Sequence, residues 1–172
     1  MVSVDEEAGW HLEATIKRMM DDYGDMLAGL CTALLGDPDL AQDIVQETFL
    51  RAYRSLQRFD GKSERAWLTR IAVNLCRDQW KSRWFRHVDR RVTPEMLPEP
   101  VMPANELSSS VLEAVQALPR VLREVILLRY FQDMKVDEVT DALHISRTTL
   151  YKRLDMAHQA LRELLEGEDR DA

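Results

Sequence analysis

The sequence predicts an all-α protein built as two small helical domains that are joined by a proline-rich linker. Apolar residues recur at spacings of three and four along most of the 172 residues, and no alternating apolar-polar run is long enough for a strand. Four prolines fall within residues 94–103, which favours extended backbone there. We therefore expect about eight helices in two domains, at residues 12–92 and 108–166, with the linker at residues 93–107. Within the second domain we expect a helix break at Pro119, and the chain should end in an acidic tail over residues 166–172.

The composition is that of a globular chain, with 45% apolar and 31% charged residues. No apolar run approaches the roughly 20 residues that a membrane-spanning helix needs. Residues 1–20 lack a basic and then apolar leader, so a cytoplasmic location is expected. Cys31 and Cys76 lie inside apolar helical patterns without a CxxC or Cys/His cluster, which indicates core residues in a reducing compartment. We expect no metal site and no cofactor.

The formal net charge is −7, and the charged residues are unevenly distributed along the chain. Residues 62–92 hold nine Lys/Arg against three Asp/Glu, whereas residues 1–30 hold two against seven. A basic block between acidic stretches is compatible with a DNA-binding surface inside an acidic protein. An ordinary solvated helix face is the alternative.

In the first domain, a long amphipathic helix is expected from about Leu12, and residues 1–10 are expected to fray because they show no periodicity. Glycine, aspartate and proline at residues 36–38 should end it. Asp39 and Gln42 resemble a capping pair that starts the next helix. The outer side of that helix would carry Asp43, Gln46, Glu47 and Arg51.

A loop at residues 58–63 should follow, with Gly61 as its breaker and Ser63 as the N-cap of a helix over residues 64–84. The polar side chains expected on the outside of this helix are Arg70, Asn74, Arg77, Asp78 and Lys81. A rigid helix lined with long cations is suited to the DNA backbone.

In the second domain, residues 136–165 predict a helix-turn-helix. The first helix is VDEVTDAL, the turn is residues 144–146, and Ser146 can cap a second helix that starts at Arg147. The buried stripe of the second helix would be Leu150, Leu154, Ala157, Leu161 and Leu164. Its exposed first turns carry Arg147, Thr148, Tyr151, Lys152 and Asp155. A recognition helix presents such polar side chains to base edges, although a plain helical hairpin would also fit.

Three stretches together resemble one protein family. They are DLAQDIVQETFLRAYRSLQRFDG, then AWLTRIAVNLCRDQWKSR, then LPRVLREVILLRYFQDMKVDEVTDALHISRTTLYKRLDMAHQALREL. In this order, with a linker between them, they are similar to the extracytoplasmic-function (ECF, group IV) RNA polymerase sigma factors of the sigma-70 family. The resemblance covers residues 12–86 and 108–165. This combined order is much more specific than a helix-turn-helix alone.

The resemblance implies sigma region 2 in the first domain and sigma region 4 in the second. Such a protein is a non-enzymatic alternative sigma factor that binds the beta and beta-prime subunits of core RNA polymerase and directs promoter recognition and transcription initiation. A stress or envelope signal and an anti-sigma factor commonly control it. The implied polymerase-binding residues are Asp43 and Gln46 of the DxxQ motif, with Glu47. The implied contacts to the −10 region are Phe59, Asp60, Lys62, Ser63, Arg70, Asn74, Arg77 and Lys81. The implied contacts to the −35 region are Arg147, Thr148, Thr149, Tyr151 and Lys152.

The chain departs from the family pattern inside the helix-turn-helix. The family often has glycine near Asp133 and at His144 and Thr148, and alanine at Thr140. His144 must therefore form the turn without the conformational freedom of glycine. The identity of the bases that are read does not transfer. Residues 135–164 carry five basic and five acidic side chains, so this half should bind DNA weakly unless polymerase holds it in place.

Two other classes of function are alternatives. A stand-alone helix-turn-helix regulator would need only the second domain, and would leave the Asp43/Gln46 helix and the basic block unexplained. An all-helical enzyme is disfavoured because no catalytic signature appears and the histidines lie in separate segments. They are His11, His87, His144 and His158.

Overall fold

The structure is a computed structural model that describes residues 4–87 and 110–171. Within these residues every regular element is a helix. The all-α prediction is therefore confirmed for this part of the chain. The chain divides into two compact units, residues 1–80 and 81–172, which we call the N-terminal unit and the C-terminal unit. The expected linker, residues 93–107, lies outside the described residues, and the expected domain boundaries stay predictions.

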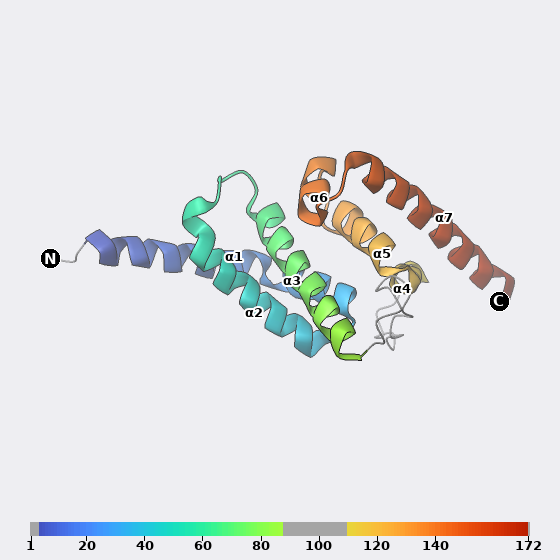
Figure 1. The fold of residues 1–172 in the computed structure, drawn as a ribbon, viewed down its shortest axis with the longest axis horizontal. Helices are drawn as coiled ribbons and strands as arrows, with labels where there is room; N and C mark the ends of the chain where they lie inside the picture. Colours follow the sequence, from blue (N-terminus) through green and yellow to red (C-terminus); the bar gives the residue numbers. More distant parts are fainter. Residues whose placement is uncertain (1–3, 88–109, 172) are drawn as a thin grey trace. The chain divides into compact units, whose positions relative to one another are not determined.

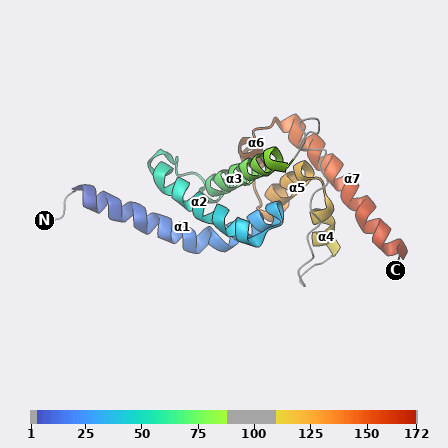
Figure 2. The ribbon, with the colours of Figure 1, turned by 60° about the horizontal axis from the view of Figure 1, so that its bottom comes forward.

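In the N-terminal unit, α1 (Val4–Leu35) and α2 (Pro38–Ser55) pack along each other (Figure 1). The start expected near Leu12 is wrong, because the helix already begins at Val4. Once a helix is nucleated each further residue adds a hydrogen bond, and acidic residues 5–7 suit the positive end of the helix dipole. The first turns of α1 extend beyond α2 in both views (Figures 1 and 2). Trp10, which belongs to these turns, is exposed.

The junction between α1 and α2 differs from the expected one. The N-cap of α2 is Asp37, and Oδ1 of Asp37 accepts a hydrogen bond from the amide of Leu40 at 3.0 Å. Pro38 follows at the first helical position, where its fixed φ suits a helix and the missing amide hydrogen has no intrahelical partner to lose. The prediction that Asp39 is the cap is therefore wrong by two residues.

A short 3-10 helix, η1 (Leu56–Arg58), and a loop lead into α3 (Glu64–His87). Ser63 is confirmed as the cap, since its Oγ accepts a hydrogen bond from the amide of Ala66 at 3.2 Å. Arg18 of α1 holds the first turn of α3, donating to the two carboxylate oxygens of Glu64 at 3.0 and 2.6 Å. Both cysteines are buried and neither forms a disulfide, as expected of core residues.

In the C-terminal unit, three short helices are covered by one long helix (Figures 1 and 2). The short ones are α4 (Ser110–Ala117), α5 (Arg120–Ile126) and α6 (Val136–Leu143), and α7 (Arg147–Asp171) packs against all three. The break at Pro119 is confirmed. Buried Arg123 stabilises it by donating from Nη2 to the carbonyls of Gln116 at 2.6 Å and Leu118 at 3.0 Å.

After α5 the chain forms a π-helical turn, η3 (Leu127–Phe131), which the apolar pattern did not predict. The amide of Gln132 donates to the carbonyl of Leu127 at 2.9 Å, five residues back, and closes this wider turn. Asp133 follows with a φ of 49°, in the left-handed region.

The far end of α7 also differs from expectation. The expected acidic tail is helical through Asp171. The predicted stripe is buried at Leu150, Leu154 and Ala157, but Leu164 is 37% exposed. Leu164 is exposed because α7 is much longer than its neighbours, with 25 residues against eight each in α4 and α6. Its last turns therefore extend beyond the helices that could cover them.

The turn of the helix-turn-helix forms without glycine. His144 closes α6 with a φ of 53°, and the amide of Ile145 donates to the carbonyl of Thr140 at 3.1 Å. The hydroxyl of Thr140 donates to the carbonyl of Asp137 at 3.0 Å, so its hydrogen-bonding capacity is met within its own helix. The fold therefore tolerates both departures from the family pattern.

Replacing His144 by glycine should stabilise the C-terminal unit. The left-handed conformation costs an L-residue about 1–2 kcal/mol, and the greater freedom of glycine in the unfolded chain offsets about 0.4–1 kcal/mol of the gain. We expect a net gain of about 0.5–1 kcal/mol, or roughly 2–8 °C in Tm by thermal unfolding. His144→Ala is the matched control, because it removes the same exposed imidazole but keeps the Cβ. A Tm of His144→Gly below that of His144→Ala would show that the backbone at His144 is unstrained, because only the greater freedom of glycine in the unfolded chain would then distinguish the two variants.

Candidate nucleic-acid and protein interfaces

The outer face of α2 is the first candidate surface. Asp43 and Gln46 are exposed on it, and Glu47 is half-buried and accepts a hydrogen bond from Nε of Arg51 at 2.8 Å. The opposite face of α2 is already filled by buried side chains, so these polar groups are not needed for the core. The structure thus places all three predicted polymerase-binding residues on one face of one helix.

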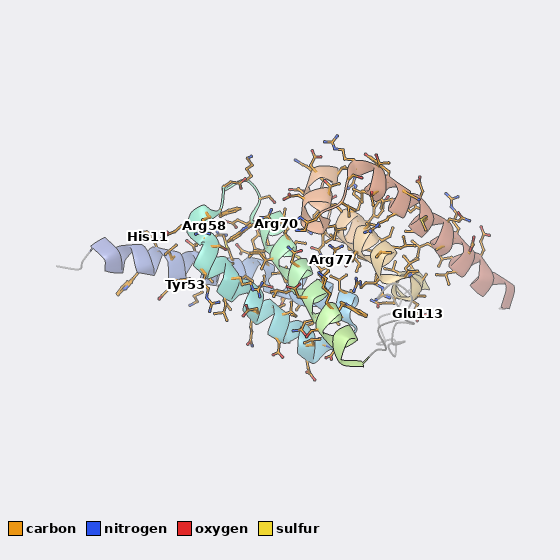
Figure 3. All side chains as sticks on the ribbon, in the orientation of Figure 1. His11, Tyr53, Arg58, Arg70, Arg77 and Glu113 are labelled. Carbon is orange, nitrogen blue, oxygen red and sulfur yellow. The ribbon has the colours of Figure 1, made fainter. Side chains whose placement is uncertain are left out.

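Two apolar side chains on α2 were missed by the sequence reasoning. Leu50 is 52% exposed and lies in the same stripe as Asp43 and Glu47, at spacings of four and three. Tyr53 is exposed at the edge of this stripe (Figure 3). An apolar residue on the polar side of a complete amphipathic helix was the available signal. Together, Asp43, Gln46, Glu47, Leu50 and Tyr53 form what we call the α2 face.

The loop after η1 is held in shape by its own residues. The ring of Phe59 stacks on that of Trp67, with centroids 4.6 Å apart and an interplanar angle of 24°. Oδ1 of Asp60 accepts a hydrogen bond from the amide of Lys62 at 3.1 Å, and Gly61 supplies a φ of 75° at the bend. The side chains of Asp60 and Lys62 are exposed. The Phe59 to Trp67 stack was not foreseen from the sequence.

The polar residues expected along α3 have different environments. Arg70 and Arg77 lie two turns apart on α3 (Figure 3), and both are half-buried and take part in interactions within the protein. Asn74 between them is half-buried, and Lys81 is exposed. The structure therefore brings these four residues onto one helix but leaves Lys81 more accessible to a partner than the two arginines.

The start of α7 is the second surface rich in hydrogen-bonding groups. Ser146 caps the helix, since its Oγ accepts a hydrogen bond from the amide of Thr149 at 3.1 Å and lies 2.9 Å from the Thr149 hydroxyl. The predicted cap is thus confirmed, and the hydroxyl of Thr149 belongs to it. Thr148, Tyr151 and Lys152 are exposed on the first turns of α7.

Arg147 at the start of α7 is paired with a carboxylate of α6. Its Nε and Nη2 donate to Oδ1 of Asp137 on α6, at 3.0 and 2.5 Å. The pair joins the two helices of the helix-turn-helix from the outside, and both side chains remain largely exposed, at 68% and 72%. This contact was not anticipated from the sequence.

Two further kinds of site are absent from the residues that the structure describes. Within them, no cluster of three or more His, Cys, Asp or Glu side chains is arranged to hold a metal ion. None of their helices combines the length and the apolar character needed to cross a membrane.

Comparison with known proteins identifies the family of this arrangement. The family model for sigma-70 region 2 matches residues 19–86, and that for sigma-70 region 4 matches residues 108–165. The ECF RNA polymerase sigma factor SigW of Bacillus subtilis is 30% identical over 162 residues, which cover 86% of this chain and 87% of that protein. The chain belongs to the extracytoplasmic-function sigma factors. The RNA polymerase sigma-H factor of Pseudomonas aeruginosa is also 30% identical, covering 87% of this chain and 86% of that protein.

Solved structures share the fold of this sigma factor. The sigma factor RpoE of Bartonella quintana, in complex with the anti-sigma factor NepR, has a TM-score of 0.68 and 22% identity, covering 87% of this chain and 96% of that chain. CnrH, in complex with the cytosolic domain of CnrY, has a TM-score of 0.64 and 23% identity, covering 90% of each chain.

Family membership settles the class of function. A sigma factor is a non-enzymatic subunit that binds core RNA polymerase and directs promoter recognition and transcription initiation, so the enzyme hypothesis falls away. A stand-alone helix-turn-helix regulator is also excluded, because the region 2 match accounts for α2, the loop after η1 and α3.

Proposed function

We propose that this sigma factor binds core polymerase through the α2 face. The supporting observation is the exposure of Asp43, Gln46 and Leu50 side by side on a helix whose inner side is complete. Such a surface combines an apolar centre with a polar rim, which is the usual anatomy of a protein interface. The half-buried Glu47, already bonded to Arg51, contributes at the rim.

The −10 region of the promoter is proposed to contact the loop after η1 and the polar side of α3. The side chains of Asp60 and Lys62 project from a loop whose shape is held by the Phe59 to Trp67 stack. A loop that is ordered before binding loses less conformational entropy when it captures a base. Ser63 caps the start of α3. The residues of α3 that we expect to contact the DNA strands of the −10 region are Arg70, Asn74, Arg77 and Lys81.

The −35 region is proposed to be read by the first turns of α7. Thr148, Tyr151 and Lys152 are exposed at the N-terminal end of the second helix of a helix-turn-helix, where recognition helices meet base edges. Arg147 lies at the same end, and Thr149 contributes through the cap that orients the helix.

Regulation and location are proposed on the basis of family membership. A sigma factor acts on core polymerase, so we propose that this one acts in the cytoplasm. The similar structures from Bartonella quintana and of CnrH were solved with a bound protein, in the first case named an anti-sigma factor. We therefore place this sigma factor under an anti-sigma factor that releases it in response to a stress or envelope signal.

Substitutions of two lysines test which proposed DNA-binding surface contacts the phosphate backbone and which one reads bases. Lys81→Ala should weaken promoter binding by holoenzyme about equally for all sequences and lower the salt slope by about one, as loss of a phosphate contact does. Lys152→Ala should relax the −35 preference, because a direct base contact supplies about 1–3 kcal/mol of discrimination.

The measurement uses promoters selected by transcription of a genomic pool with core polymerase. Binding of each holoenzyme to matched and base-substituted fragments is then compared at two salt concentrations. If Lys152→Ala lowers binding uniformly and keeps the sequence preference, Lys152 contacts the backbone and its assignment as a reader is wrong.

A further inference from the structure

The ion pair between Arg147 and Asp137 leaves one edge of the guanidinium available. A guanidinium has five N–H donors. Two of them, on Nε and Nη2, point to the single oxygen Oδ1 of Asp137. Both hydrogens of Nη1 and the second hydrogen of Nη2 have no partner within the part of the chain that the structure describes. Two of these three, one on each Nη nitrogen, form a parallel pair at the tip of the side chain.

A parallel pair of donors matches one base edge in the major groove. Guanine presents two adjacent acceptors there, O6 and N7, and an arginine that bonds to both is the commonest specific contact between proteins and DNA. Adenine and cytosine each place an amino donor in that groove and thymine offers only O4, so none of them provides the same two acceptors. The available edge of Arg147 is therefore selective for guanine.

The contribution of Asp137 to folding does not explain why this carboxylate lies beside the recognition helix. The pair is mostly exposed, and exposed ion pairs contribute little to stability. A carboxylate near DNA also repels phosphates, and residues 135–164, with five basic and five acidic side chains, have no surplus of positive charge to compensate. An acidic residue in the first turn of α6 also suits the helix dipole, but Glu138 shares that role, whereas it is Asp137 that accepts from Arg147. The benefit specific to Asp137 is that it fixes the plane of the Arg147 side chain before binding, since an arginine otherwise loses rotamer entropy when it bonds to a base.

We infer that Asp137 is a positioning residue for promoter recognition, which holds the Arg147 guanidinium so that its Nη1 and Nη2 edge faces a guanine of the −35 element. This rests on the proposed role of the first turns of α7 as the −35 reader. The inference adds Asp137 of α6, which lies outside the recognition helix, to the residues that determine promoter specificity. It also identifies guanine as the base that Arg147 reads.

The experiment compares two substitutions with the same charge change. Asp137→Ala removes the oxygen that holds Arg147, whereas Asp137→Asn keeps an accepting oxygen at the same place. Both should raise holoenzyme affinity for all promoters to a similar degree, because both remove one negative charge near the phosphates. Only the alanine variant should also lower the preference for guanine.

The probes are duplex promoter fragments from the genomic selection, with each −35 position changed to the other three bases in turn. Wild-type holoenzyme should prefer guanine at one position by roughly 5- to 150-fold, the range expected of an arginine–guanine contact, and Arg147→Ala should abolish that preference. Asp137→Ala should reduce it by about 3- to 10-fold, Asp137→Asn by less, and Asp137→Ala should have no further effect on it in the Arg147→Ala background.

Two results overturn the inference and are distinguishable. If Arg147→Ala removes a guanine preference that Asp137→Ala leaves intact, Arg147 reads the base without help and only the role of Asp137 is wrong. If Arg147→Ala changes no −35 preference, Arg147 is not a reader and both the proposal and the inference fail at this residue. Unchanged thermal unfolding of the variants confirms that the effects arise at the interface.

Discussion

Leu50→Asp is expected to weaken association with core RNA polymerase by roughly 30-fold or more, because a carboxylate would replace the apolar centre of the α2 face. Half of the Leu50 side chain is exposed in the free protein, so the substitution does not disturb the core. In the complex the same position would bury an unpaired charge, at a cost of about 2 kcal/mol or more. Titration of labelled core polymerase with the wild-type and variant proteins measures the ratio of Kd values.

The matched control is Met20→Asp, which introduces the same charge at an equally exposed apolar side chain of α1, 48% against 52%. It should leave the Kd unchanged. Gln46→Ala should have a smaller effect than Leu50→Asp, and Asp43→Arg a larger one than Gln46→Ala, with little change in Tm for any of them. Equal Kd values for Leu50→Asp and Met20→Asp would place the polymerase-binding surface elsewhere.

Leu150→Ala is expected to have the largest effect on folding. Leu150 is fully buried in the first turn of α7, in the stripe that packs on the shorter helices. A buried Leu→Ala substitution costs about 2–5 kcal/mol, which is comparable with the total stability of a unit of this size. We expect the Tm of the C-terminal unit to fall by at least about 10 °C, measured by thermal proteolysis with mass spectrometry.

The matched control for this change is Leu164→Ala, the same substitution near the other end of α7, where the side chain is 37% exposed. It should shift the Tm by only a few degrees. Peptides of the N-terminal unit should keep their protection in Leu150→Ala, because that unit has its own core, and core polymerase should still bind. Simultaneous loss of protection in both units would show that they do not fold separately.

The sequence predicted the helix-turn-helix well because its signals are local. VDEVTDAL forms α6 with the expected ends, and Ser146 caps the helix that starts at Arg147. Both depend on interactions within four residues along the chain. The Ser63 cap succeeded for the same reason. The break at Pro119 succeeded because a proline cannot continue a helix.

Where two local signals competed, the sequence alone was a weaker guide. At the start of α2, the Asp39 and Gln42 pair predicted a cap at Asp39, but Pro38 suits the first helical position and the cap is therefore Asp37. The π-helical turn at Leu127–Phe131 had no signal of its own in the apolar pattern, because an extra residue in one turn changes the register without changing the composition.

The sequence by itself determined the all-α class, the family and the residues expected to meet polymerase and promoter, since these follow from periodicity and from motifs in a fixed order. The tertiary structure decided which of those side chains are available. It showed Phe59 stacked on Trp67 and Arg147 held by Asp137 ten residues earlier. Periodicity assigns a residue to a face of its own helix, but these contacts depend on the neighbouring elements, whose distance and angle are set by packing. For that reason the pairing that orients Arg147 became visible only when α6 and α7 were placed side by side.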